Sequence, residues 1–155
     1  MSFKNSQDYE IKSSYLIDLV TTDGTTTRTT SVTINLNNLN DNSPSITQTV
    51  FTIPENQNII TETLFTDPDC PGIFNSSCAG GSGGGTPYSW NITGADQNCV
   101  EVTNVSVPGT LEFSSACPPN FEVKNSYSFT LEVSDGTYSD SENFVVNLTD
   151  VNDAP

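Results

Sequence analysis

The sequence contains no histidine and only 4 basic residues against 19 acidic ones, which gives a formal charge of −15 over 155 residues. The lack of histidine excludes a mixed cysteine–histidine zinc site. The shortage of Lys and Arg argues against nucleic-acid binding, because neutralising phosphates requires these side chains. The charge fits a cationic partner instead, although an acidic surface also serves solubility alone.

Long apolar runs are missing as well. No run approaches the roughly 20 apolar residues that span a bilayer, and residues 1–4 carry no signal-peptide core. We therefore expect no membrane insertion, and an extracellular protein would have its export signal outside this sequence.

Nothing in the sequence combines a nucleophile with an evident base. Glu101 and Glu112 could imitate a glycosidase pair, but two carboxylates on a sheet surface are usually incidental. The sequence therefore predicts a protein that is not an enzyme.

Four cysteines allow three pairings. Their irregular spacing does not suit an all-cysteine zinc site, so two disulfides formed in an oxidising compartment are the better interpretation. Cys70 and Cys78 flank a short loop, while Cys99 and Cys117 flank a predicted hairpin with its turn at 107–110. We favour the two local pairs, Cys70–Cys78 and Cys99–Cys117.

The sequence repeats itself at an offset of 112 residues. The matching stretches are 9–15 with 121–127, 23–24 with 135–136, and 40–41 with 152–153. A period of this size is typical of tandem domains rather than solenoids. Residues 1–44 are therefore predicted to be the C-terminal half of one domain, and 45–155 a complete second domain.

Alternating apolar residues predict short strands in both units. Two strands, 14–22 and 28–37, surround Asp23-Gly24 in the first unit. Seven strands follow in the second unit without an amphipathic helix; they are 50–53, 59–64, 88–92, 100–102, 110–113, 129–133 and 144–148. This pattern predicts an all-β, seven-stranded antiparallel Greek-key β-sandwich, preceded by half of another.

A glycine-rich stretch at 70–87 interrupts the strand pattern and predicts an exposed loop. It contains the sequon at Asn75, which is the best glycosylation candidate because the sequons at Asn91, Asn104 and Asn147 lie in or beside predicted strands.

Short acidic motifs recur at the strand ends in a fixed order. They are Asp8-Tyr9-Glu10, Asp23-Gly24, 38–44, Pro54-Glu55-Asn56, Asp67-Pro68-Asp69, Asp135-Gly136 and 150–155. Each is weak alone, but together they cover nearly the whole chain, and by them it resembles a cadherin repeat that follows the back half of another. The loop at 70–87 is not typical of vertebrate members and suggests a microbial or divergent version.

The resemblance implies calcium at the joint between repeats, and calcium takes six to eight hard oxygen ligands in irregular geometry. Carried over by motif, the ligands of the first joint would be Asp8, Glu10, Asn40, Asp41, the Asn42 carbonyl, Asp67, Asp69 and Asp135. Those of the second joint would be Glu55, Glu122, Asp150 and Asp153.

The sequence departs from the family pattern at two positions. Asn38 stands where the first linker Asp is expected, and Asn120 replaces the Asp of the second D-x-E motif. We therefore expect one or two calcium ions at the first joint rather than three. The second joint should be empty or weak, because no domain follows it in this sequence.

The implied function is a calcium-binding extracellular repeat that rigidifies a tandem adhesin or surface filament, supports cell adhesion and has neighbouring repeats as partners. Two alternatives stay open. The chain could bind a surface glycan or protein through the loop at 70–87. It could also self-assemble, with residues 1–44 completed by strands of a neighbouring chain, because so few strands cannot bury an independent core.

Overall fold

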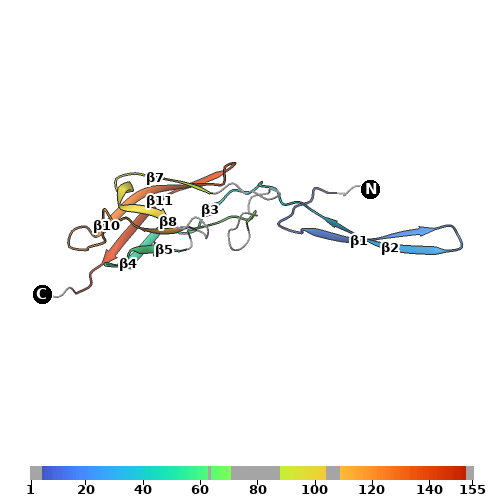
Figure 1. Cartoon of the computed structure of the whole chain (residues 1–155), viewed down its shortest axis with the longest axis horizontal. Helices are drawn as coiled ribbons and strands as arrows, with labels where there is room; N and C mark the ends of the chain where they lie inside the picture. Colours follow the sequence, from blue (N-terminus) through green and yellow to red (C-terminus); the bar gives the residue numbers. More distant parts are fainter. Residues whose placement is uncertain (1–4, 63, 71–87, 104–108, 153–155) are drawn as a thin grey trace.

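The computed structural model describes residues 5–62, 64–70, 88–103 and 109–152. The chain is elongated, with a long hairpin at one end and a two-sheet domain that carries the C-terminus at the other (Figure 1). In the described part of the chain, no helix is long and apolar enough to cross a membrane. The elements are β1 (Ser14–Thr22), β2 (Thr27–Asn35), β3 (Ser45–Ile46), β4 (Val50–Pro54), β5 (Ile59–Thr61), β6 (Phe65–Thr66), β7 (Ser89–Thr93), a 3-10 turn η1 (Gln97–Cys99), β8 (Val100–Thr103), β9 (Thr110–Phe113), β10 (Ser126–Ser134) and β11 (Ser139–Thr149).

The strands β1 and β2 form an antiparallel hairpin in continuous register from Ser14↔Asn35 to Thr22↔Thr27. Its turn is fixed by Asp23, whose Oδ1 accepts the N–H groups of Thr25 and Thr26 at 2.9 and 2.7 Å. Gly24 follows with φ of +93°, a left-handed conformation that suits glycine. The Asp-Gly pair therefore sets the hairpin turn that the sequence predicts.

The larger sheet of the domain has the order β4-β11-β10-β7. Alternation along β10 buries every second side chain, and Tyr127, Phe129, Leu131 and Val133 are all at most 3% exposed. The aromatic rings of Phe129 and Phe144 stack at 5.3 Å across the β10–β11 pair. This face is the centre of the core.

A second sheet, β5-β9-β8, closes the sandwich. Phe113 of β9 packs edge-on against Tyr127 of β10 with ring centroids 4.8 Å apart, which joins the two sheets. Trp90 of β7 lies at the rim of the core and contacts the ring of Phe65 at 5.1 Å. The predicted all-β sandwich is thus confirmed.

Two features differ from the seven predicted antiparallel strands. Among the described residues, β3 and β6 form an additional two-residue ladder, too short to produce an alternation signal. In addition, β4 pairs with β11 in parallel, from Val50↔Val145 to Pro54↔Thr149. These two strands are far apart in the sequence, so no hairpin turn imposes an antiparallel direction on them.

The Cys99–Cys117 disulfide is present, as predicted. Cys70 is also disulfide-bonded. Its predicted partner Cys78 lies outside the described residues, and so do Asn75 and residues 71–87 of the glycine-rich loop.

A buried carboxylate ties the β7–β8 connection to the start of β10. Asp96 is 7% exposed; it forms an ion pair with Lys124 and accepts the N–H of Ser128 at 2.8 Å. Burial alone would raise the pKa of Asp96, but the hydrogen bonds from Lys124 and Ser128 outweigh burial and lower the pKa below its ordinary value. The charged form of Asp96 therefore stabilises the fold.

We expect Asp96→Asn to lower the free energy of unfolding at pH 7 by about 1–2 kcal/mol, since the half-exposed Lys124 is partly screened by solvent. Because the pKa of Asp96 is lowered in the folded state, its contribution exists above about pH 4 and is lost as the pH falls further. Urea unfolding of both proteins from pH 7 to pH 3 measures this, and the difference should shrink at low pH. A difference that is independent of pH would show that charge plays no part.

Candidate metal centre

Three carboxylates converge where the hairpin meets the sandwich. Glu10 precedes β1, Asp41 lies in the linker and Asp69 follows β6, yet each offers an oxygen within 4.8 Å of the others. Like charges at this separation repel by about 1 kcal/mol per pair in water and by about 3 kcal/mol at an effective dielectric of 20. An arrangement of this kind favours a cation between the three groups.

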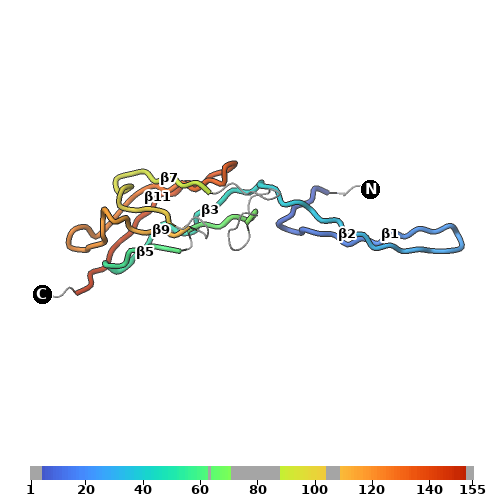
Figure 2. Tube along the Cα trace, in the orientation of Figure 1, coloured from blue at the N-terminus to red at the C-terminus, as the bar shows by residue number. Residues whose placement is uncertain are grey.

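Asp69 is the centre of this group and is 1% exposed. Its Oδ2 accepts the linker N–H groups of Asp41 and Asn42 at 3.1 and 2.8 Å, and its Oδ1 accepts the Asn42 amide at 2.8 Å. These bonds fasten residues 38–44 to the sandwich, and Figure 2 shows this linker passing from β2 to β3. The joint is therefore partly ordered by the chain's own hydrogen bonds.

Asp67 is held immediately behind Asp69 and is 4% exposed. It accepts the Asp69 N–H at 2.9 Å and the Tyr88 hydroxyl at 2.7 Å. Burial raises the pKa of Asp67, and so do the negative charges of Asp69 and Asp135. The two hydrogen bonds lower the pKa but do not outweigh burial. Burial likewise raises the pKa of the Tyr88 hydroxyl far above its usual range, and the hydrogen bond to Asp67 is the next largest cause. A cation would relieve this accumulation of charge.

Asp135 divides its two oxygens between the fold and the joint. Its Oδ1 accepts the N–H groups of Thr137 and Tyr138, both at 2.7 Å, and closes the β10–β11 turn. Its Oδ2 faces the side-chain amide of Asn40 at 2.9 Å, and Asp69 Oδ2 faces the same amide at 3.3 Å. With the Asn40 nitrogen turned inward these contacts are hydrogen bonds. With its oxygen turned inward, Asn40 Oδ1 meets Asp69 Oδ2 and Asp135 Oδ2, and these three oxygens are suitable ligands for a hard cation.

Asn38 supplies a separate test of whether the site fits a cation. Its Nδ2 donates to the backbone carbonyl of Asp69 at 2.8 Å, while its Oδ1 is fully buried and has no hydrogen-bond partner among the described residues. A buried acceptor without a donor is costly, and an oxygen of this kind is a suitable calcium ligand. The residues of the joint therefore fit calcium.

Two further predicted ligands of the first joint, Glu10 and Asp8, precede β1. Glu10 belongs to the converging group, and desolvation, followed by the charge of Asp69 and a side-chain hydrogen bond with Asp8, raises its pKa. Asp8 is not one of those three carboxylates, and its Oδ1 accepts the N–H of Ile11 at 3.1 Å within the turn before β1.

A second carboxylate group lies at the end of β4, far from the hairpin, where Glu55, Glu122 and Asp150 also come within 4.8 Å of one another. The N–H groups of Val151 and Phe121 each donate to Glu55 at 2.8 Å, and they lower its pKa. The structure thus brings together three of the four predicted residues of the second joint. Asp153 lies outside the described residues.

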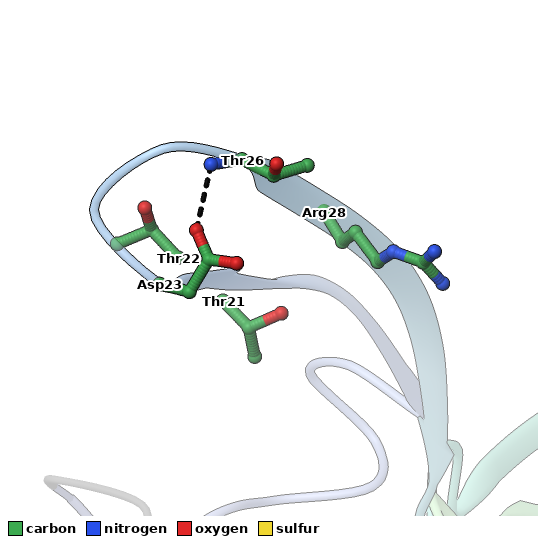
Figure 3. Close-up of a pocket in the computed structure, with 5 residues that line it drawn as sticks. All are labelled: Thr21, Thr22, Asp23, Thr26 and Arg28. Carbon is green, nitrogen blue, oxygen red and sulfur yellow. Dashed lines mark hydrogen bonds between the residues drawn. The ribbon is translucent and has the colours of Figure 1, made fainter.

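The hairpin tip carries a shallow hollow lined by Thr21, Thr22, Asp23, Thr26 and Arg28 (Figure 3). One oxygen of Asp23 is occupied by the turn. The turn hydrogen bonds lower the pKa of this carboxyl. Asp23 therefore repeats the turn-closing role of Asp135.

Sequence reasoning did not identify Tyr88 and Asp140 as side chains that shape the joint, and it interpreted Asn38 only as a lost charge. Tyr88 supports Asp67, Asn38 bonds Asp69, and Asp140 accepts the N–H of Ile46 at 2.8 Å and so anchors β3 directly after the linker. An isolated Tyr, Asn or Asp in a strand or linker gives no signal of such a contact, because the partner lies at least 21 residues away in each case.

The sequence matches no protein-family model and no curated protein. Solved cadherin ectodomains match its structure. Human desmocollin-1 is 17% identical with a TM-score of 0.67, and 94% of this chain aligns with 28% of that one. Chicken VE-cadherin repeats 1–2 are 18% identical with a TM-score of 0.62, covering 94% and 71% of the two chains. Protocadherin gamma B7 repeats 1–4 are 20% identical with a TM-score of 0.60, and 95% of this chain aligns with 34% of that one.

These likenesses establish a cadherin-like fold. The chain spans about a third or less of the length of the desmocollin and the four-repeat protocadherin.

Proposed function

We propose that this cadherin-like chain is a calcium-binding extracellular unit whose joint at 38–44 becomes rigid when calcium binds. The observation that carries the proposal is the convergence of Glu10, Asp41 and Asp69 from three separate stretches within 4.8 Å. No single loop supplies these charges, so a cation that binds all three must fix the hairpin, linker and sandwich relative to one another.

Calcium, when bound, supplies charge neutralisation and several oxygen bonds at once. The ligands would be Glu10, Asn40, Asp41, Asp67, Asp69 and Asp135, with Asp8 and the Asn42 carbonyl as further candidates. Asp69 orients the linker through its three hydrogen bonds. Asp135 Oδ2 and the Asn40 amide face one another on the sandwich side of the joint.

The second carboxylate group would serve the next joint of an array. Glu55 directly follows β4 and Asp150 directly follows β11, and Figure 1 shows these two strands in the sandwich, on the side away from the hairpin. Such an arrangement suits a repeat that continues in a line, as in a tandem adhesin or surface filament, with neighbouring repeats as its partners. The Cys99–Cys117 disulfide supports an oxidising, extracellular location, and adhesion is the role we assign to the array.

Calorimetric titration tests the proposed calcium site. We expect calcium to bind with a dissociation constant on the order of 10⁻⁴–10⁻³ M, the range of extracellular modules. Asp69→Asn and Glu10→Gln should each weaken binding at least about tenfold. Glu142→Gln, which removes one charge from the exposed part of β11, is the matched control and should bind normally.

Small-angle scattering of the same proteins tests the stiffening. Calcium should narrow the distribution of hairpin-to-sandwich orientations in the parent and in Glu142→Gln, but not in Asp69→Asn. If calcium binds but the scattering does not change, the calcium site is supported and its role in stiffening the joint is refuted.

A further inference from the structure

A disulfide-bonded cysteine directly follows the central carboxylate of the first joint. Cys70 is 4% exposed and belongs to a disulfide. The sequence has four cysteines, and Cys99 is bonded to Cys117, so Cys78 is the partner that remains for Cys70 within the chain. A covalent bond therefore fixes the backbone position next to Asp69.

The turn from Asp67 to Cys70 is short and is closed by its own hydrogen bonds. The N–H of Cys70 donates to the carbonyl of Asp67 at 3.0 Å. The N–H of Asp69 donates to Asp67 Oδ1 at 2.9 Å. Both carboxylates thus lie within three residues of the disulfide, and a displacement of the Cys70 backbone must move them as well.

The other contacts that hold this turn are noncovalent. Strand β6, which precedes the turn, has only two residues and pairs with β3 through Ser45↔Thr66 and Ile46↔Phe65. The Tyr88 hydroxyl donates to the Asp67 carboxylate at 2.7 Å. The disulfide is therefore the covalent anchor of the turn.

The charges of the joint act against this anchor. Asp69 has an oxygen within 4.8 Å of oxygens of Glu10 and Asp41, and like charges at this distance repel one another. Without a cation, this repulsion favours an outward displacement of Asp69. A covalent anchor at Cys70 resists the displacement and keeps the carboxylates close to the arrangement that a cation requires. Such preorganisation raises affinity because less ordering is needed on binding.

The same turn also holds the linker. Asp69 Oδ2 accepts the N–H groups of Asp41 and Asn42 at 3.1 and 2.8 Å. The backbone carbonyl of Asp69 accepts the side-chain amide of Asn38 at 2.8 Å. A turn that shifts at Cys70 would therefore loosen the linker together with the carboxylates.

We propose that the disulfide of Cys70 positions the first joint for calcium, so that calcium affinity depends on the thiol–disulfide state of Cys70. This proposal rests on the calcium site proposed above. Reduction by a dithiol transfers two electrons and two protons to the disulfide. The sulfur–sulfur bond breaks, Cys70 and Cys78 become thiols, and the dithiol closes into its own disulfide.

Coupling between the two equilibria is reciprocal. If reduction weakens calcium binding by some factor, calcium must make the disulfide harder to reduce by the same factor. Partners that orient metal ligands typically change metal affinity by about tenfold or more. For a two-electron couple, a factor of ten corresponds to about 30 mV.

Calorimetric titration of calcium tests the first half of this coupling. Cys70→Ser/Cys78→Ser should bind calcium about tenfold more weakly than the parent. Cys99→Ser/Cys117→Ser is the matched control, because it removes the other disulfide, which joins η1 to the segment after β9. The control should bind calcium as the parent does.

Redox titration of the parent tests the second half and does not depend on the folding of a variant. The parent is equilibrated with a dithiol and its disulfide, in calcium or in EDTA, and the free thiols are alkylated and counted by mass spectrometry. Calcium should lower the ratio of reduced to oxidised Cys70 about tenfold. The same ratio at Cys99 should not change.

Calcium protection of Cys70 and not of Cys99 supports the proposal, and a matching loss of affinity in Cys70→Ser/Cys78→Ser strengthens it. Equal protection of both disulfides would mean that calcium acts through global stability, and it would overturn the proposal. A parent that binds calcium but shows no protection of Cys70 would overturn the coupling and leave the calcium site standing. A parent that binds no calcium would refute the site and the coupling together.

Discussion

Calcium at about 100 times its dissociation constant should raise the melting temperature of the chain by about 10–20 °C relative to EDTA. Such an excess of a ligand that binds only the folded state stabilises it by about 2.7 kcal/mol, and each kcal/mol shifts the midpoint of a domain near 100 residues by roughly 4–8 °C. Asp67, Asp69 and Asp135 all belong to the sandwich and are at most 4% exposed, so its unfolding must release the ion.

Scanning calorimetry in calcium, in magnesium and in EDTA provides the measurement. Magnesium should stabilise the chain less, since it demands a near-ideal octahedral site. Asp69→Asn should lose most of the calcium-dependent shift, and Glu142→Gln should keep it. Identical midpoints in calcium and EDTA would rule out calcium as a structural ligand of this joint.

Leu131→Ala and Leu19→Ala form the second large contrast, because the two leucines occupy equivalent positions in β10 and β1. Leu131 is 0% exposed, so truncation should cost about 2–5 kcal/mol through lost burial and a cavity. Leu19 is 38% exposed, and its truncation should cost less than about 1 kcal/mol.

Urea unfolding followed through Trp90 measures this contrast, since Trp90 is the single tryptophan of the chain and lies in the sandwich. Leu131→Ala should move the unfolding midpoint strongly, while Leu19→Ala should leave it nearly unchanged. Equal losses for both substitutions would mean that the hairpin unfolds together with the sandwich.

Local patterns predicted much of the fold. The alternation of Phe129, Leu131 and Val133 predicted a strand at 129–133, which is the larger part of β10, because successive side chains of a strand point to opposite sides. Asp-Gly at 135–136 predicted the turn that follows, because the Asp side chain accepts turn amides and glycine adopts positive φ.

The sequence did not reveal which distant segments meet. The parallel β4–β11 pair and the short β3–β6 ladder depend on contacts between remote residues. The ion pair of Asp96 with Lys124 spans 28 residues and carries no motif. Asn38 was interpreted as a lost charge, while the structure shows that it bonds the backbone of Asp69.

The sequence by itself determined the β class, the longer strands with their Asp-Gly turns, the Cys99–Cys117 disulfide and the acidic motifs at strand ends, because each depends on side chains close together along the chain. Only the tertiary structure decided that Glu10, Asp41 and Asp69 lie within 4.8 Å of one another while Asp8 stands outside that group. It also decided how far two hairpins of the same register are exposed, with Leu131 of β10 at 0% and Leu19 of β1 at 38%. The physical reason is that burial and charge proximity depend on what packs around a segment, and local sequence does not encode that.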